Sequence, residues 1–484
     1  MSEQVFGRSR QSEGMFLNTH LGVESTPLAA IVQHSFRSDL ATIEGQGARS
    51  RASYYQSANS RPHIRLSDNM LRLLVLFSCV VSGVLSEPSG AEEACVIELE
   101  CAECVPDHMP LVTSHRASAG AVRVAPGDEV ALACHGGAFL NYPQRALLTA
   151  VCEAGRFRVR HDHALRHLLE LGCQESIFED VLHQVEECAP PLQGRAYQLA
   201  EARGPLHLAA LCFDPDRGVA ARALATNAPA NALPLPAHAE HGAPRSLLGN
   251  FNQMFDASTR AQARALYSDD ARMNRRLRQI LKHERFSFAE QTLTSARLLS
   301  PLYYEDQNMR VADFVSNRVA AWRSVAAGNL AHLQRDVAEL MKAARPRTAI
   351  DVYAGTHDVL ALRTGHAKSE IFLKPGRFPV PKYIWTVVHD RKHAKALALV
   401  VLNDPFVSVS EIRASVFCES ACGRVSWLHE LRRHRHYESP LYGLAFCCAV
   451  RDFGAVVKEM PRHIVRAVPD ADGGMLTDIG LGPD

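Results

Sequence analysis

Two stretches of the chain carry the alternation of apolar and polar residues that is typical of β-strands. In residues 121–134, AVRVAPGDEVALAC, two alternating runs flank Pro-Gly-Asp, a common turn composition between strands. From residue 349 onward, AIDVYAGTHDVLAL, SEIFL, YIWTVVHD and ALALVVLND alternate or run apolar, separated by Gly, Pro and Lys residues. We therefore expect a small β module in the N-terminal half and a sheet in the C-terminal half.

Between these strands, apolar residues recur at helical spacing. Residues 329–341, NLAHLQRDVAELM, form an apolar stripe, and His332 lies off that stripe on a polar side. Residues 256–286 have the same periodicity, and their polar face includes Arg275 and Arg276. That face could contact phosphates, or it could be a solvated face balanced by acidic neighbours. Strands, then helices, then strands again predict a mixed α+β fold.

The first 86 residues differ in kind from the rest. Residues 1–69 are rich in Ser, Arg, Gln and Gly without sustained periodicity, which predicts a disordered upstream extension. Residues 70–86, MLRLLVLFSCVVSGVLS, are typical of a signal peptide that is cleaved after Ser86. The apolar run is too short to span a bilayer comfortably, so we expect a secreted, extracellular protein without stable membrane insertion. If Met1 is the natural start, the run could stay uncleaved or act as a signal anchor.

Cysteine usage agrees with secretion. The chain has 13 cysteines, and removing Cys79, which lies in the signal segment, leaves 12, an even number. Cys101 and Cys104 form the only Cys-x-x-Cys element, so no second such pair completes a zinc spacing, and disulfides are the favoured use of the thiols. Seven cysteines fall in residues 87–195, which we interpret as a small disulfide-rich β module.

Composition limits the classes of partner. A hydrophobic content of 47% and a charged content of 22% are typical of a globular protein, and a formal net charge of +1 predicts no global attraction to nucleic acid or membrane. Binding to a polyanion would need local patches. Besides Arg275 and Arg276, the candidates lie in LRRHRHYESP, at Arg432, Arg433 and Arg435, where a solvated loop is an equally good interpretation.

The strands of the C-terminal half also carry a family resemblance. Within residues 352–405, VYAGTHDVLAL, IFLKPGRFPVPKYIWTVVHD and ALALVVLNDP follow one another in order. This order resembles the secreted arthropod branch of the DNA/RNA non-specific endonuclease family, the ββα-metal or His-Me finger nucleases that include gut double-stranded ribonucleases. The resemblance implies an endonuclease-like domain at residues 196–465, with antiparallel sheets and flanking helices, followed by a tail at residues 466–484.

Active members of that family cut phosphodiesters with three groups. A histidine activates water, an asparagine holds a divalent ion such as Mg²⁺, and a glutamate on the next helix supports the water shell of the metal. Aligned without gaps, ARLLSP at residues 296–301 places Leu298 at the histidine. FVSNRVAAWRSVAAGNLAHLQ at residues 314–334 places Ala326 at the asparagine and Gln334 at the glutamate.

The resemblance therefore implies a nuclease fold without nuclease chemistry. Leucine cannot accept a proton, alanine has no oxygen for a hard cation, and glutamine lacks the charge that orders metal-bound water. The motif residues that remain are Asn317, Trp322, Gly328 and Asn329. We expect a secreted pseudo-nuclease that needs no metal cofactor and retains binding to nucleic acid or another ligand.

Two other functions remain open. The first is an active metal-dependent endonuclease for DNA or double-stranded RNA whose site is displaced, with His332, His283 or His357 as the base. The second is a non-enzymatic interaction protein that uses the Cys-rich module for recognition.

Overall fold

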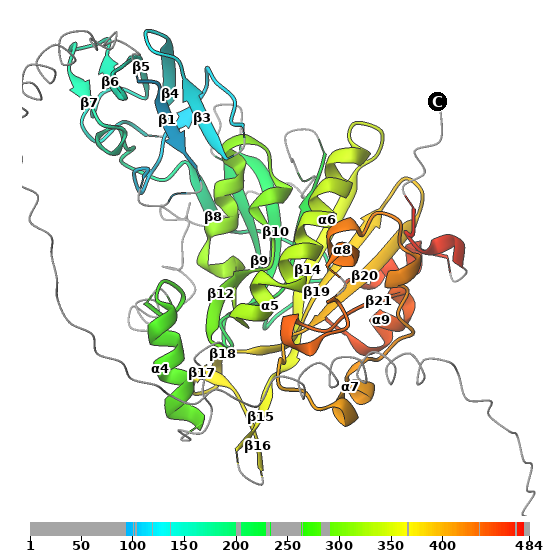
Figure 1. The fold of residues 1–484 in the computed structure, drawn as a ribbon. Helices are drawn as coiled ribbons and strands as arrows, with labels where there is room; N and C mark the ends of the chain where they lie inside the picture. The colour runs from blue at the N-terminus through cyan, green and yellow to red at the C-terminus, as the bar shows by residue number, and fades with distance from the viewer. Residues whose placement is uncertain are drawn as a thin grey trace, which may run out of the picture. The chain divides into compact units, whose positions relative to one another are not determined.

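The computed structural model describes residues 93–478, apart from residues 100, 102–103, 119, 136, 200–204, 229–232, 234–262, 264, 282–290, 365–366, 435 and 470–471. The predicted extension and signal segment therefore lie outside the described residues. No helix in the described ranges is long and apolar enough to cross a membrane. Antiparallel sheets, helices and disulfides make up this part of the chain, which confirms the α+β class (Figure 1).

Seven short strands form two antiparallel sheets in the N-terminal part. β1 pairs with β3, and a five-stranded sheet has the order β2-β4-β5-β6-β7. The expected turn at residues 126–128 does separate two strands, and Gly127 has a φ of +83° there, which glycine adopts without steric cost. The two strands, β3 and β4, pair with different partners. The strand bounds are β1 Cys95–Glu98, β2 Leu111–Val112, β3 Ala121–Val124, β4 Glu129–Ala133, β5 Leu147–Glu153, β6 Arg156–Val159 and β7 Leu165–Arg166.

Disulfides pair all the cysteines that follow the signal segment, which confirms their predicted use. Three bridges lie in the N-terminal part, one joins it to the next strands, and two lie near the C-terminus. The pairs are Cys95–Cys152, Cys101–Cys104, Cys134–Cys173, Cys188–Cys212, Cys418–Cys448 and Cys422–Cys447.

An eight-stranded antiparallel sheet of order β21-β20-β19-β14-β11-β10-β9-β8 is the main layer. The apolar runs of the sequence form its long strands, and Trp385 of β19 lies opposite Val400 of β20. The sheet begins before residue 195, at which the sequence suggested the end of the Cys-rich module. The bounds are β8 Phe178–Leu182, β9 Gln193–Leu199, β10 Leu206–Asp214, β11 Val219–Thr226, β14 Ile350–Val359, β19 Pro381–Asp390, β20 Lys395–Leu402 and β21 Ala445–Cys448.

Both faces of this sheet are covered. Successive side chains of a strand point to opposite faces, and Tyr353, Trp385 and Val387 pack on one face with Phe453 and Ile464. These last two come from α9 (Val450–Val456) and α10 (Arg462–Ala467). The other face packs against α6 (Asn329–Ala344), whose predicted apolar stripe is buried. Burial on both faces explains why the central strands read as continuous apolar runs.

A two-stranded hairpin and two helices stand beside this sheet. β12 (Leu293–Arg297) pairs antiparallel with β13 (Arg318–Trp322), and α5 (Arg323–Ala327) and then α6 follow directly in the chain. α4 (Asp270–Leu281), which lies within the stretch predicted as a helix at residues 256–286 and follows a break at residues 268–269, contacts β12. The Asn274 amide joins them, because it donates to the Leu293 carbonyl at 2.8 Å and accepts from the Leu293 N–H at 2.7 Å.

Short elements complete the described part. The strands are β15 Ala361–Thr364, β16 Ala367–Glu370, β17 Phe372–Lys374 and β18 Arg377–Pro379. The short helices are η1 Leu168–Glu170, η4 Pro301–Tyr303, η5 Asp306–Asp313, η6 Val315–Asn317, α7 Val409–Ser415, η7 Cys422–Arg424, α8 His429–Arg433, η8 Pro440–Tyr442 and η9 Asp472–Gly474.

Candidate functional site

The position aligned with the family histidine lies just after β12, inside the core. Leu298 is only 1% exposed, and its N–H donates to the Asn317 carbonyl at 3.0 Å. An isobutyl group held in a closely packed interior contributes packing and no proton transfer. The hydrophobic environment also explains why a leucine is stable here, since each buried apolar side chain of this size contributes about 1.5–3 kcal/mol to folding.

Asn317 holds the two ends of the hairpin segment together. It is fully buried, and its Oδ1 accepts the Leu299 N–H at 2.9 Å. Its Nδ2 donates to the carbonyls of Leu299 and Ala312, both at 2.9 Å. Every polar atom of this side chain is therefore bonded to backbone, so the residue acts as a structural clamp between β12 and the turn before β13.

Gln334, aligned with the family glutamate, packs α6 onto the end of β12. Its Nε2 donates to the Arg297 carbonyl at 2.9 Å, which places the side chain next to the backbone of Leu298. Arg297 itself pairs with Asp313 at 2.6 Å, and Arg318 pairs with the same carboxylate at 2.9 Å. Burial and, to a lesser extent, the neighbouring Arg297 lower the pKa of Arg318 to about 10, which leaves it positively charged at pH 7. The surroundings of Gln334 are thus cationic and hydrogen-bonded.

Ala326, aligned with the metal-binding asparagine, lies on α5. It is half-buried and packs against the hydrophobic core, and α5 contacts both β12 and β13. Its methyl group offers no ligand atom. The structure thus brings Gln334 and the backbone of Leu298 together at one junction, where their side chains supply packing and one amide hydrogen bond.

The other retained motif residues are all placed by packing. Trp322 is fully buried, and its backbone N–H donates to Asn403 Oδ1 at 3.0 Å. Gly328 is required between α5 and α6, because an added Cβ would lie 2.4 Å from the Ser324 carbonyl oxygen. Asn329 donates from Nδ2 to two backbone carbonyls, at 3.0 and 2.7 Å, and its buried Oδ1 has no hydrogen-bond partner in the part of the chain that the structure describes.

The candidate polyanion-binding residues fall into two separate groups. On α4, Arg275 is exposed, and Arg276 donates to the Leu373 carbonyl at 3.0 Å and is half-buried. On α8, Arg432 and Arg433 are exposed and line a depression of about 730 Å³. Arg435 lies outside the described residues. The structure therefore offers α8 as the more accessible of the two basic surfaces.

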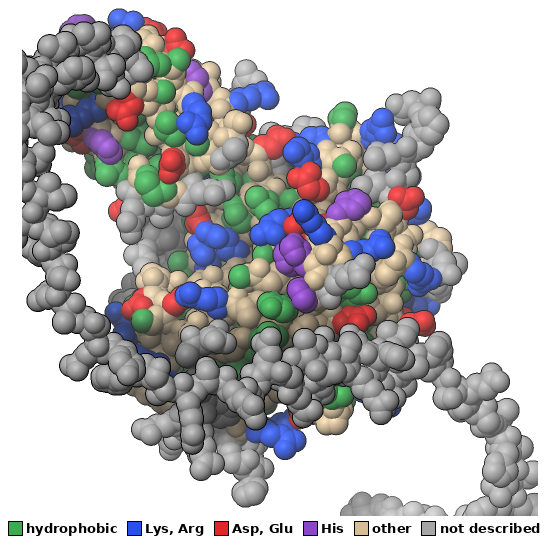
Figure 2. Space-filling model, viewed as in Figure 1, with side chains coloured by type: hydrophobic (Ala, Val, Ile, Leu, Met, Phe, Trp, Pro, Cys, Tyr) green, Lys and Arg blue, Asp and Glu red, His purple; other side chains and the backbone are tan. Residues whose placement is uncertain are grey.

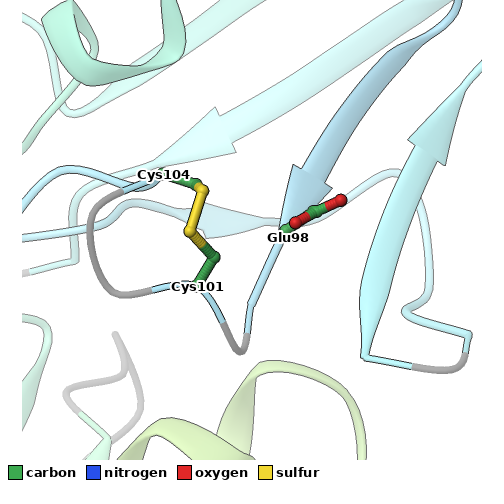
Figure 3. A group of neighbouring side chains, drawn as sticks. All are labelled: Glu98, Cys101 and Cys104. Atoms are coloured by element: carbon green, nitrogen blue, oxygen red, sulfur yellow. A yellow bond between two sulfur atoms is a disulfide. The ribbon is translucent and has the colours of Figure 1, made fainter. Parts of the chain in front are cut away.

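Among the residues that the structure describes, three groups of side chains have the composition of a metal site, and the first is excluded by its own chemistry. Glu98, Cys101 and Cys104 lie close together, but the two sulfur atoms form a disulfide (Figure 3). A disulfide sulfur is not the thiolate that binds zinc. This confirms the preference for a disulfide over a metal at the Cys-x-x-Cys element.

The second group has one carboxylate that is already engaged by backbone. It consists of Glu186, Glu187 and His463. The Glu187 carboxylate accepts the N–H groups of Arg462 and His463, at 2.6 and 3.0 Å, and Tyr353 Oη lies 3.3 Å from the His463 Nε2. This arrangement attaches the start of α10 to the segment before β9.

The third group lies where α8 meets α6, which are in contact (Figure 1). It consists of His332 on α6, Glu430 on α8 and His434 at the end of α8. Histidine side chains lie next to Lys and Arg side chains on this face of the molecule (Figure 2). Burial lowers the pKa of His332 below its usual value, and the neighbouring His434 adds to this effect. The imidazole is therefore neutral at pH 7.

Sequence reasoning placed His332 on a polar side of its helix and interpreted LRRHRHYESP only as a basic segment. It did not connect the two, because they are far apart in the chain. One local signal was present: Glu430 and His434 are four residues apart, which puts them on one face of a helix. Their convergence with His332 depends on tertiary packing alone.

Comparison with known proteins finds a distant relative. No protein family model matches the chain. The chain is similar to "Salivary protein Tsal1" of Glossina morsitans morsitans, with 24% identity over 151 residues, which is 31% of this chain. The match spans about a third, 36%, of the length of that protein. The chain is thus distantly similar to a tsetse salivary protein, and its disulfides are consistent with secretion.

Proposed function

We propose that this protein is a secreted, salivary-type pseudo-nuclease, which keeps a nuclease-like hairpin and helix and binds a polyanion without hydrolysing it. The observation that carries the proposal is the burial of Leu298 at the position where the family has its base. Two further positions, Ala326 and Gln334, replace the metal ligand and its supporting carboxylate. Their substitution supports a loss of the whole reaction, because base and metal act together in phosphodiester hydrolysis.

Secretion is supported by three observations of different kinds. The distant relative is named as a salivary protein, all 12 cysteines after Cys79 are paired, and residues 70–86 have the pattern of a signal peptide. Disulfides form and persist in oxidising, extracellular environments. A salivary setting would give the protein access to host fluids, in which polyanions include nucleic acids.

Polyanion binding is supported by the exposed basic surface of α8. Arg432 and Arg433 line the same depression as His429 and Glu438. Guanidinium groups pair bidentately with phosphate oxygens, so two neighbouring arginines give the charge and geometry for a phosphodiester backbone. A net charge of +1 for the whole chain means that such binding has to be local and salt-dependent.

The test is a paired assay of cleavage and binding on the secreted, oxidised protein. Plasmid DNA and double-stranded RNA are incubated with Mg²⁺ or Mn²⁺, and a chelator control reveals metal-dependent cleavage. Binding to a labelled RNA duplex is followed by fluorescence anisotropy between about 50 and 200 mM salt. We expect no cleavage, together with binding that weakens as salt rises.

A matched pair of variants separates the proposed surface from general charge. Replacing Arg432 and Arg433 by alanine should weaken binding and lower the salt slope by about 2, because each phosphate contact contributes about 0.9. Arg413→Ala changes an exposed arginine on α7 and should leave the slope unchanged. Equal slopes for all three proteins would refute the α8 surface, and chelator-sensitive cleavage by the unmodified protein would refute the loss of activity.

A further inference from the structure

His332, Glu430 and His434 converge from two helices although they are far apart in the chain. His332 Nδ1 and Glu430 Oε2 are 4.0 Å apart, and His434 Nε2 lies 3.9 Å from the same carboxylate oxygen. All three ligand atoms lie within 4.8 Å of one another. Two imidazoles and one carboxylate form the donor set that proteins use for Zn²⁺ and related transition metals when one coordination position stays open.

A cationic group already stands beside two members of this cluster. Arg335 Nη1 lies 3.2 Å from His332 Nδ1 and 3.5 Å from Glu430 Oε2. Because an arginine only donates, the Nδ1 atom of His332 must present its lone pair to it. That lone pair is the one a metal ion would use. The guanidinium therefore marks a position where the protein favours positive charge, and it blocks that position as long as it stays there.

The backbone that carries Glu430 is fixed to α6. Asp336, one turn after His332, is 2% exposed, and its two oxygens accept the N–H groups of Glu430 at 2.7 Å and of Leu431 at 2.9 Å. These two bonds attach the first turn of α8 to α6. The backbone that carries the Glu430 carboxylate is thus held against α6 before any ion arrives, which lowers the entropy lost on binding.

We propose that His332, Glu430 and His434 form a binding site for a divalent transition metal of the Zn²⁺ type, with Arg335 as a gate that has to move aside. In a tetrahedral site the ligand atoms lie about 2.0–2.1 Å from the ion and therefore about 3.3–3.4 Å apart. The separations of the two imidazole nitrogens from the carboxylate oxygen need to close by roughly half an ångström. The inference concerns binding and stands whether or not the chain hydrolyses nucleic acid.

Two side chains have to move, and both are free enough to do so. The rings of His332 and His434 are stacked, with centroids 4.3 Å apart and an angle of 18° between planes, and a metal lies in the plane of the imidazole that binds it. The His434 ring therefore turns on binding. Its side chain is 45% exposed and that of Arg335 is 48% exposed, whereas the side chain of His332 is only 15% exposed.

The experiment titrates the full, disulfide-bonded chain with Co²⁺ and Zn²⁺ after treatment with chelator. Co²⁺ reports its coordination by its visible absorption, and a competing chromogenic chelator measures the Zn²⁺ affinity. His434→Ala and Glu430→Gln should each weaken Zn²⁺ binding by at least about tenfold and remove the Co²⁺ bands. Arg335→Gln should strengthen binding, because it removes a competing cation.

Controls separate this site from other metal sites and from unfolding. His436→Gln changes a neighbouring histidine outside the group and should leave the affinity unchanged. Thermal unfolding of each variant shows that it is folded, and His434→Ala is at an exposed position. Binding that is the same in His434→Ala, Glu430→Gln and the parent would overturn the proposal, as would weaker binding in Arg335→Gln. Neither result depends on cleavage, so the metal site and the loss of nuclease activity succeed or fail separately.

Discussion

Replacing Asn317 by alanine is the most direct test of the idea that the retained motif residues are structural. The side chain makes three hydrogen bonds to backbone, all at 2.9 Å, and lies at a position with no exposure. Alanine would remove all three bonds and leave the Leu299 N–H and the carbonyls of Leu299 and Ala312 without these partners. Leu299 and Ala312 are themselves fully buried, so water cannot easily replace the amide.

The size of the effect follows from these lost partners. A buried donor or acceptor left unsatisfied costs about 1–3 kcal/mol, and the N–H of Leu299 has lost its acceptor outright. Carbonyl oxygens have two lone pairs and tolerate a missing donor better, so the two carbonyls together add about as much again. We therefore expect Asn317→Ala to lower the free energy of unfolding by about 3–5 kcal/mol, which is far above the average for single substitutions.

Urea unfolding of the oxidised protein, followed by tryptophan fluorescence, measures this change. Asn308→Ala is the matched control, since it makes the same substitution at a half-buried position of η5 and should change stability by less than about 0.5 kcal/mol. Asn317→Asp adds a second comparison, because it keeps the acceptor for Leu299 and loses both donors. A loss below about 1 kcal/mol for Asn317→Ala would show that the clamp is not needed and that the residue is retained for another reason.

Three further expectations follow. Leu298→His, Ala326→Asn and Gln334→Glu together should give Mg²⁺-dependent cleavage that the parent lacks, whereas each alone should do little because base and metal act as a unit; an inactive but folded triple variant would contradict the alignment. Alkylation without reduction should label few of the cysteines after the signal segment, and extensive labelling would place the protein in a reducing compartment. Burial lowers the pKa of His389 to about 4, and both its ring nitrogens lack hydrogen-bond partners among the described residues. Because the unfolded chain takes up this proton near pH 6.5, stability should fall as pH falls from about 6.5 to about 4. His389→Phe should reduce that loss in unfolding midpoints measured across the range, and an identical pH profile would count against this origin.

The elements that could be predicted from the sequence are those whose conformation follows from the pattern of their own side chains. The apolar runs of β19 and β20 and the stripe of α6 were visible because burial on a fixed face imposes a fixed period. β12, LTSAR, was not predicted. Only two of its five residues are buried, and its place depends on the Asn274 amide and on pairing with β13. Such a strand owes its conformation to tertiary contacts, which local patterns do not record.

The same distinction applies to the candidate site. Alignment by motif located Leu298 and Gln334, and the hydrogen bond from Gln334 to the Arg297 carbonyl shows that these positions meet in space. What the sequence could not supply was their environment. Whether Leu298 lined an open cleft or filled the core depended on α6 and the hairpin packing together. The His332 cluster was hidden for the same reason, since its ligands come from α6 and α8.

The retained and the replaced positions differ in what they do for the backbone. Asn317 bonds to the backbone around the hairpin, and Trp322 fills the core beside it. Gly328 lets its own backbone lie close to the Ser324 carbonyl oxygen, which any side chain would prevent. Substituting one of them would destabilise the fold directly. The groups that the resembling nucleases carry at positions 298, 326 and 334 act on a substrate and an ion, so under the proposed function their absence leaves the backbone bonds intact, and leucine at position 298 adds buried apolar area. The stability of the fold therefore requires Asn317, Trp322 and Gly328. It does not require the nuclease groups at positions 298, 326 and 334, and at position 298 it favours leucine. Under the proposed function, this asymmetry would let a nuclease-like fold persist without its reaction, and the opposite outcomes expected for Asn317→Ala and for the restored triple variant test it from both sides.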